Sequence, residues 1–223
     1  MEYEYRLVDR DLAVDGVKRL LPDVVWKIAN TELVEGIGLP EVQMICGGKA
    51  TEGMTVKEVI TVHNLKRAMQ FMLANLDRPV DLDLVKEYNR IVCESLCDKP
   101  GMPAIGKIEE VLRLAKEIDH PIKQGFYLFG HIAREQWFND GNERTAQLVA
   151  NHVFVQNNVA MLAVPVEERE NFWHKLVKFY ETGQQDDLND FLYKTSIGIM
   201  PGGLTMEKTR EIDERNRKWL GLE

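Results

Sequence analysis

The sequence predicts an all-α fold, and three observations support this class. Apolar residues recur at helical spacing through most of the chain, as in the segment from Val59 to Met72. Segments with the strict alternation of a half-buried β-strand are scarce. Proline and glycine fall between the periodic segments, where they end helices and form turns. We therefore expect helices joined by short loops.

The first quarter of the chain predicts three helices. One covers about residues 11–21, and a second begins near Pro22, because proline fits the first turn of a helix. The second ends at Gly36 and Gly38, since glycine is a helix-ending residue. A short helix follows from about Pro40 and ends at two further glycines. We expect residues 1–54 to form an amino-terminal helical segment.

The middle of the chain holds the longest periodic segments. The spacing of apolar residues predicts further helices at 55–76, 81–97, 107–117, 121–135, 143–157, 166–182 and 187–196. Residues 98–106 contain two prolines and two glycines, which exclude a helix there and permit a loop or short β-hairpin. We expect residues 55–198 to form the core and residues 199–223 a charged tail helix.

Composition restricts the class of protein. The chain has 223 residues, of which 44% are hydrophobic and 29% charged, as in ordinary globular proteins. A net charge of −8 argues against a protein that coats nucleic acid, because phosphate binding needs clustered Lys and Arg. No apolar run reaches the roughly 20 residues of a membrane span, and the amino terminus lacks the layout of a secretory signal. Three cysteines are too few for a disulfide framework. These features predict a cytoplasmic protein with reduced cysteines.

The candidate functional stretch is residues 138–145, a loop that leads into a helix. Asp140, Gly141 and Asn142 are turn-forming residues, and helical spacing begins at Glu143. The N-terminus of such a helix directs several unpaired backbone N–H groups at one place. That geometry suits an anion, particularly a phosphate.

The sequence around this turn resembles the signature of the Fic family, His-Pro-Phe-x-Asp/Glu-Gly-Asn-Gly-Arg-x-x-Arg. Here it reads Gln136-Trp137-Phe138-Asn139-Asp140-Gly141-Asn142-Glu143-Arg144. Five fixed positions are shared: Phe138, Asp140, Gly141, Asn142 and Arg144. The family's histidine, proline, second glycine and last arginine are replaced by Gln136, Trp137, Glu143 and Gln147. A second stretch, Thr31-Glu32-Leu33-Val34-Glu35-Gly36, resembles the inhibitory helix motif Ser/Thr-x-x-x-Glu-Gly/Asn of many Fic proteins.

The resemblance implies a Fic-type helical fold that transfers AMP from ATP to a hydroxyl of a target protein, with Mg²⁺ as cofactor. On this basis Asp140 would be the metal ligand, and Gln136 would stand at the position of the catalytic histidine. The phosphate- or nucleotide-binding positions would be Gly141, Asn142, Glu143, Arg144 and Gln147. The regulatory positions would be Thr31, Glu35 and Gly36. Residues 98–106 would be the flap that receives the target protein.

The replaced residues predict that AMP transfer is weak or absent. Gln136 cannot take a proton from a hydroxyl, and a positioned general base typically contributes about 10² to 10⁴ in rate. His131 does not replace it, because five residues on a helix place it about 140° around the axis. Glu143 adds a negative charge beside the expected phosphates, which repels them. With Gln147 in place of arginine, Glu35 has no arginine to pair with at that position.

Several functions therefore stay open at the level of sequence. The chain is a nucleotide- or phosphate-binding regulator, a pseudoenzyme that binds a partner, or an enzyme that transfers a different phosphate-bearing group. A helical interaction module, in which Asp140-Gly141-Asn142 is only a turn, is a further alternative. Expected partners are a target protein at residues 98–106, and neither nucleic acid nor membrane. The tail and Trp219 permit a homodimer.

Overall fold

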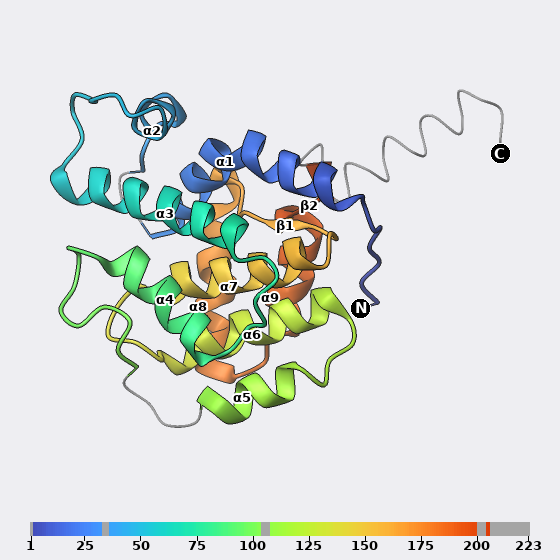
Figure 1. Cartoon of the computed structure of the whole chain (residues 1–223). Helices are drawn as coiled ribbons and strands as arrows, with labels where there is room; N and C mark the ends of the chain where they lie inside the picture. Colours follow the sequence, from blue (N-terminus) through green and yellow to red (C-terminus); the bar gives the residue numbers. More distant parts are fainter. Residues whose placement is uncertain (1, 33–35, 104–107, 200–203, 206–223) are drawn as a thin grey trace.

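A computed structural model describes residues 2–32, 36–103, 108–199 and 204–205. The helices are α1 (Arg10–Glu32), α2 (Leu39–Cys46), α3 (Val56–Ala74), α4 (Leu82–Cys93), α5 (Ile108–Ala115), α6 (Pro121–Glu135), α7 (Asn142–Gln156), the 3-10 turn η1 (Val166–Glu168), α8 (Arg169–Thr182), α9 (Asp186–Phe191) and the π-turn η2 (Leu192–Ser196). The strands are β1 (Met161–Leu162), β2 (Ile197–Ile199) and β3 (Leu204–Thr205). Figure 1 shows a helical molecule with one small sheet. The all-α prediction is confirmed.

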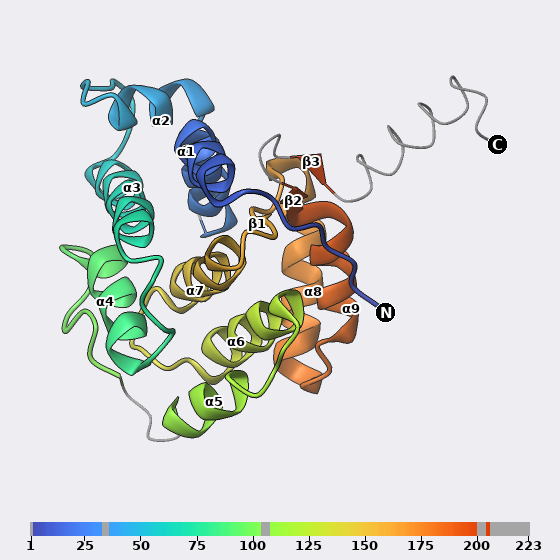
Figure 2. The same ribbon diagram turned by 45° about the vertical axis from the view of Figure 1, so that its right-hand side comes forward.

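Helix α7 lies at the centre of the molecule. Figure 2 shows it surrounded by α1, α3, α4 and α6, with α8 beyond it. Every residue from Arg144 to Val155 is buried, and after Arg144 this stretch has no Asp, Glu, Lys or Arg on any of its faces. Its closest neighbour is α6. Gly125 of α6 makes room for Phe154, since a Cβ at Gly125 would overlap the Phe154 ring.

Helix α1 corrects one of the predicted boundaries. The expectation of two helices that separate at Pro22 is wrong, because Pro22 lies inside one continuous helix. Proline removes a single backbone hydrogen bond. The buried residues on both sides of it, including Val17 and Val25, pack into the same core. Packing of one apolar face outweighs the local cost of the proline, as is common for buried helices.

Helix α3 begins where the sequence predicts. Its N-terminus carries a capping box: the Thr55 side chain accepts from the Glu58 backbone N–H, and the Glu58 carboxylate accepts from the Thr55 backbone N–H. Helix α4 begins similarly, with the Asp81 carboxylate accepting from the Leu84 N–H. These caps set the positions of two helices that flank α7.

The small sheet closes one end of the fold. Its strand order is β1-β2-β3, and both pairs are antiparallel, with Met161 opposite Gly198 and Ile199 opposite Leu204. In the predicted flap, residues 98–103 form a turn, and Pro103 makes an isolated antiparallel bridge to Phe138. Residues 104–107 lie outside the described residues, so a hairpin over 98–106 stays a prediction.

The structure bears on two further predictions, the tail helix and the absence of a membrane span. The tail helix expected at 199–223 lies almost entirely outside the described residues. Within the described residues, no helix has the length and hydrophobicity needed to cross a membrane.

Candidate functional site

The loop before α7 is held by the side chain of Asn142. Its Oδ1 accepts from the Phe138 N–H at 2.9 Å, and its Nδ2 donates to the Phe138 carbonyl at 2.7 Å. Gly141 has φ +69°, a left-handed conformation that favours glycine. A Cβ at Gly141 would lie 2.5 Å from the Cys93 sulfur of α4. The turn predicted from Asp140-Gly141-Asn142 is therefore present and tightly packed.

Asn89 of α4 is hydrogen-bonded to this loop. Its Nδ2 donates to the Asp140 carbonyl at 2.9 Å and to the Thr145 hydroxyl at 3.2 Å. Its Oδ1 accepts from the Gly101 N–H at 2.8 Å. One buried amide thus joins the candidate site, the first turn of α7 and the beginning of the predicted flap. No sequence motif marked Asn89, because its three partners come together only in the fold.

Arg144 is the one buried cation of the site in the described residues, with 4% of its surface exposed. Its Nε lies 2.7 Å from a carboxylate oxygen of Glu32, at the end of α1, and its Nη2 lies 3.4 Å from Oδ1 of Asp140. Nη1 donates to the Val92 carbonyl at 3.3 Å. Within the described chain the buried Nε has no hydrogen-bond partner, so the Glu32 contact is an ion pair with poor alignment.

The carboxyl groups near Arg144 have shifted affinities for protons. Burial raises the pKa of Glu32 above its ordinary value, in spite of the opposing charge of Arg144. Burial and the nearby charge of Glu32 raise the pKa of Glu143 to about 7. The hydroxyl of Tyr180, on α8, donates to Glu143 Oε1 at 3.0 Å. Glu143 therefore titrates near neutrality, and it turns toward α8.

Gln136 ends α6 with φ +51°, and its side chain is occupied by structural contacts. Its Nε2 donates to the Ala133 carbonyl, and its Oε1 accepts from Asn142 Nδ2 at 3.1 Å. The amide lies beside the loop, at the position where the resemblance expects a catalytic histidine. It offers a weak hydrogen-bonding group and no group that accepts a proton near neutral pH.

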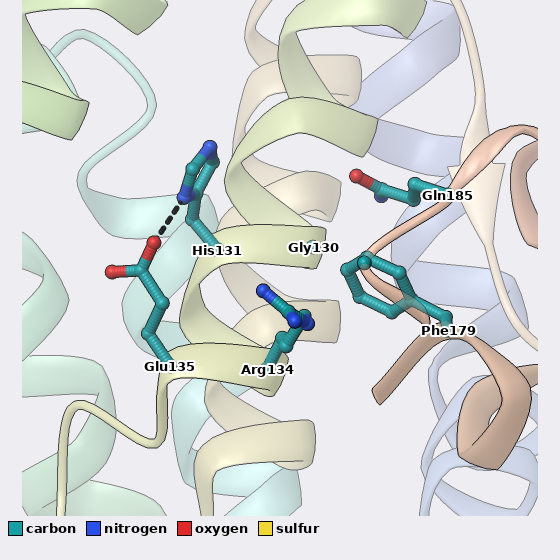
Figure 3. Close-up of a pocket in the computed structure, with 7 residues that line it drawn as sticks. Gly130, His131, Arg134, Glu135, Phe179 and Gln185 are labelled. Carbon is teal, nitrogen blue, oxygen red and sulfur yellow. Dashed lines mark hydrogen bonds and ion pairs between the residues drawn. The ribbon is translucent and has the colours of Figure 1, made fainter. Parts of the chain in front are cut away.

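His131 lies in a different cavity. Its Nδ1 is 2.5 Å from Oε1 of Glu135, and Glu135 Oε2 accepts from the Trp137 indole at 3.0 Å. Figure 3 shows the His131 ring directed at Glu135, on the opposite side of the α6 ribbon from Phe179 and Gln185. Together with Gly130, Arg134 and Gly183 these residues line a cavity of about 110 Å³. His131 is not among the residues that line the cavity at Asp140.

The predicted regulatory positions lie at the end of α1. The Thr31 hydroxyl accepts from Gln147 Nε2 at 3.1 Å and donates to the Ile28 carbonyl at 2.7 Å, and both residues are buried. Gln147 thus lies behind the cavity, and its Oε1 has no partner in the described residues. Gly36 has φ +77°. Glu35 lies outside the described residues, whereas its neighbour Glu32 reaches Arg144.

A cavity of about 210 Å³ opens above the loop. Its walls are formed by Glu32, Gln136, Asn139, Asp140, Gly141, Asn142 and Glu143. The structure thus brings together most of the predicted site residues, with Arg144 in contact with two of the lining carboxylates. No group of three potential metal ligands is found in the described residues. The half-exposed carboxylate of Asp140 fits the single protein ligand that Mg²⁺ commonly takes when phosphates supply others.

Comparison with solved structures decides the fold. The chain is similar to Fic-1 (residues 134–508) from C. elegans, with a TM-score of 0.65 and 19% identity over 80% of this chain. It is also similar to a Fic domain containing signaling protein from Bacteroides thetaiotaomicron, with a TM-score of 0.64 and 15% identity, covering 80% of this chain and 84% of that one. The chain has the Fic fold. A Fic family protein from Desulfovibrio desulfuricans gives a TM-score of 0.61 at 12% identity, covering 86% and 73% of the two chains.

The share of the matched protein that is covered differs between these structures. The chain spans 61% of the length of the C. elegans Fic-1 chain that it matches. By sequence, neither a family model nor a curated protein matches this chain. The likeness therefore lies in the fold.

Two contacts at the candidate site were missed by sequence reasoning. Glu32 lies within the inhibitory-type motif, but the motif indicated Glu35 as its acidic regulatory residue, and Glu32 was not considered. Tyr180 had no sequence signal, since its contact with Glu143 depends on how α8 packs against α7. A search for glutamates near the end of the inhibitory-type helix would have found Glu32 as a second candidate.

Proposed function

We propose that this Fic-fold protein binds a phosphate-bearing ligand, with ATP and Mg²⁺ as the first candidates, and that it transfers AMP weakly or not at all. The observation that carries the proposal is the buried Arg144 Nε, which lies 2.7 Å from Glu32 and has no well-aligned acceptor among the described residues. A phosphate in line with the guanidinium could accept paired hydrogen bonds, whereas Glu32 contacts Nε in poor alignment. Glu32 would therefore compete with the ligand for Arg144.

The residues around Arg144 support the same ligand class. The N-terminus of α7 directs backbone N–H groups toward the turn, a common setting for phosphate. Asp140 would hold Mg²⁺, which supplies positive charge to the phosphates when bound. Protonation of Glu143 near pH 7 would remove one negative charge from the cavity.

The expected weakness of AMP transfer rests on Gln136. In this protein an amide with both ends hydrogen-bonded stands where a proton acceptor is needed. His131 pairs with Glu135 and lines another cavity, so it would not substitute. The chain's own residues would bind and orient a phosphate-bearing ligand. Glu143, whose pKa of about 7 would suit a base, is hydrogen-bonded to Tyr180 and turned toward α8, so it would not take over the role of the missing histidine.

Calorimetric titration with ATP and Mg²⁺ tests the binding proposal. The Glu32→Gln variant should bind about ten-fold more tightly than the native chain, because its amide no longer competes as an anion for Arg144. Asp140→Ala should bind more weakly, and Glu109→Gln on the exposed face of α5 is the matched control. If Glu32→Gln shows no binding at millimolar ATP, the proposal fails.

Transfer is tested with labelled ATP and the protein itself as acceptor. The native chain should incorporate little AMP, and a Gln136→His, Glu143→Gly double variant should incorporate more, since it regains a base and loses a repelling charge. Efficient labelling by the native chain would contradict the predicted loss of activity.

One observation favours a second candidate, an interaction module without nucleotide chemistry. Three carboxylates, those of Glu32, Asp140 and Glu143, line a cavity whose one neighbouring cation in the described residues is Arg144. Such an excess of negative charge disfavours an anion that arrives without a metal. For such a module, Asp140→Ala would leave partner binding unchanged.

A further inference from the structure

A second cavity lies on the side of α4 that faces away from the candidate site. It has a volume of about 470 Å³ and is formed by the end of α3, the turn after it, α4 and the turn at Pro100 and Gly101. Its residues include Phe71, Arg78, Lys86, Arg90, Pro100 and Gly101. We call it the α3–α4 groove. Its volume falls in the range of small-molecule sites, about 300–1,000 Å³.

Helix α4 separates the two sites. Asn89 and Cys93 face the loop at Asp140, where both contact its carbonyl. Lys86 and Arg90 lie four residues apart on the other face and line the groove. The α3–α4 groove is therefore independent of the cavity at Asp140.

Two carboxylates, Asp83 and Glu87, also line the groove, and among the described residues Arg78 is its one cation without a directly contacting carboxylate. The charge of Arg78 contributes to lowering the pKa of Glu87, whose carboxylate is bonded to Arg90. Arg90 is paired with Glu87 through two contacts of 2.8 and 2.6 Å. Lys86 has a loose contact with Asp83 at 3.7 Å. Asp77, the acidic neighbour of Arg78 in sequence, is paired with Arg10 at 2.6 Å. For the half-buried Arg78 guanidinium, no ion pair or hydrogen bond is found within the described part of the chain.

The backbone of Arg78 is fixed by α7. Its carbonyl accepts from His152 Nε2 at 3.1 Å and from Gln156 Nε2 at 2.9 Å. His152 is fully buried, and its Nδ1 lies 2.7 Å from the hydroxyl of Tyr88. Gln156 also donates to the Leu76 carbonyl. The turn that carries Arg78 is thus a rigid support, which reduces the entropy lost when a ligand binds.

The groove also offers apolar surface, from Phe71 and Pro100. The Phe71 ring is partly exposed to the groove and is held edge-on against Tyr88, with ring centroids 5.4 Å apart. Gly101 brings the Pro100 turn close to α4. Its φ is +75°, and a Cβ there would lie 2.8 Å from the Lys86 carbonyl. The groove therefore combines a ring, a proline and a guanidinium that no carboxylate of the described residues contacts directly.

We propose that the α3–α4 groove binds a small organic anion, whose phosphate or carboxylate pairs with Arg78 and Lys86 while its flat body lies between Phe71 and Pro100. A guanidinium and a planar ring at one site recognise a negative group attached to an aromatic or similarly flat body. Arg90 holds the wall of the groove through Glu87. Its own charge is already balanced.

Phenyl phosphate is the probe for this site, titrated into the full chain and followed by ¹H–¹⁵N NMR and calorimetry. The backbone signals of Lys86 and Gly101 should shift, and inorganic phosphate should bind more weakly because it lacks the ring. Arg78→Gln should weaken binding by about ten-fold or more, and Arg78→Lys should retain part of it. Arg113→Gln is the matched control, because Arg113 lies on the surface of α5, where it pairs with Glu117.

Each contrary result overturns the proposal. One such result is the absence of shifts at the groove at about 10 mM probe, a concentration that would largely fill a site with a Kd of about 1 mM. Another is unchanged affinity in Arg78→Gln. Shifts confined to Gly141 and Arg144 would assign the probe to the candidate site instead. Equal affinity for inorganic and phenyl phosphate would remove the role of Phe71. None of these outcomes depends on ATP binding at Asp140.

Discussion

Two arginines near opposite ends of α7 have opposite surroundings. Arg144, in its first turn, is buried and touches the carboxylates of Glu32 and Asp140. Arg78 is held against its last turns through His152 and Gln156, and its guanidinium makes no direct ion pair in the described residues. One helix thus positions both cations, while neighbouring helices decide which is neutralised. Arg144 should therefore matter for stability as well as for binding at the candidate site, and Arg78 for binding in the α3–α4 groove alone.

The largest expected effect is that of Arg144→Gln. It leaves the carboxylates of Glu32 and Asp140 without their cation, and loss of one partner of a buried ion pair costs about 3–5 kcal/mol. Urea unfolding followed by circular dichroism measures the change. Adding Glu32→Gln should recover part of the loss, because it removes one unpaired charge. A loss below about 1 kcal/mol would show that Arg144 is not needed to balance these carboxylates.

Gly141→Ala tests how tightly the loop beside Arg144 is packed. The substitution forces a residue with a Cβ into a left-handed conformation and against Cys93, which should cost about 2–3 kcal/mol in unfolding free energy. Gly48 is the matched control, since it has φ +75° and a Cβ added there would meet nothing within 4 Å. Gly48→Ala should cost about 1 kcal/mol, from backbone strain alone. Equal costs would mean that the contact with Cys93 relaxes easily.

Glu143→Gln should change the pH dependence of stability. The pKa of Glu143 is raised in the folded state to about 7 from 4.5, so the folded chain holds more protons than the unfolded chain between these values. Its contribution to stability is therefore full below about pH 4.5 and is lost as the pH rises through 7. The glutamine keeps an acceptor for Tyr180 and does not ionise.

Relative to the native chain, Glu143→Gln should therefore gain roughly 2 kcal/mol between pH 5 and pH 8. Unfolding by urea at the two pH values measures this difference. A gain that is the same at both values would contradict a raised pKa for Glu143. Tyr180→Phe, which removes the hydroxyl that donates to Glu143, should leave the direction of the pH dependence unchanged.

Arg78→Gln should have the smallest effect on stability. Because no carboxylate pairs with Arg78 in the described residues, the substitution should change the unfolding free energy by less than about 0.5 kcal/mol. The same variant should lose anion binding in the α3–α4 groove. A destabilisation as large as that of Arg144→Gln would erase the contrast between the two arginines.

Much of the fold was predictable from local patterns. Helical spacing indicated the segments that became α3, α4, α6 and α7, and the turn at Asp140-Gly141-Asn142 followed from residues that favour turns. Pro22 misled the prediction, because its local cost is smaller than the gain from packing one long α1 helix. The Fic fold was expected from five matching positions and is shown by comparison with solved structures.

The pairing of charges was not predictable in the same way. Turn and helix signals act between residues a few positions apart, so sequence alone shows where α7 begins and that Gln136 is not a base. The contacts of Arg144 with Glu32, of Glu143 with Tyr180 and of the Arg78 turn with His152 join different helices. They depend on how α1, α8 and the end of α3 pack around α7, because an ion pair forms only when packing brings its partners within a few ångströms. Tertiary structure therefore decided which arginine is neutralised and which is left open.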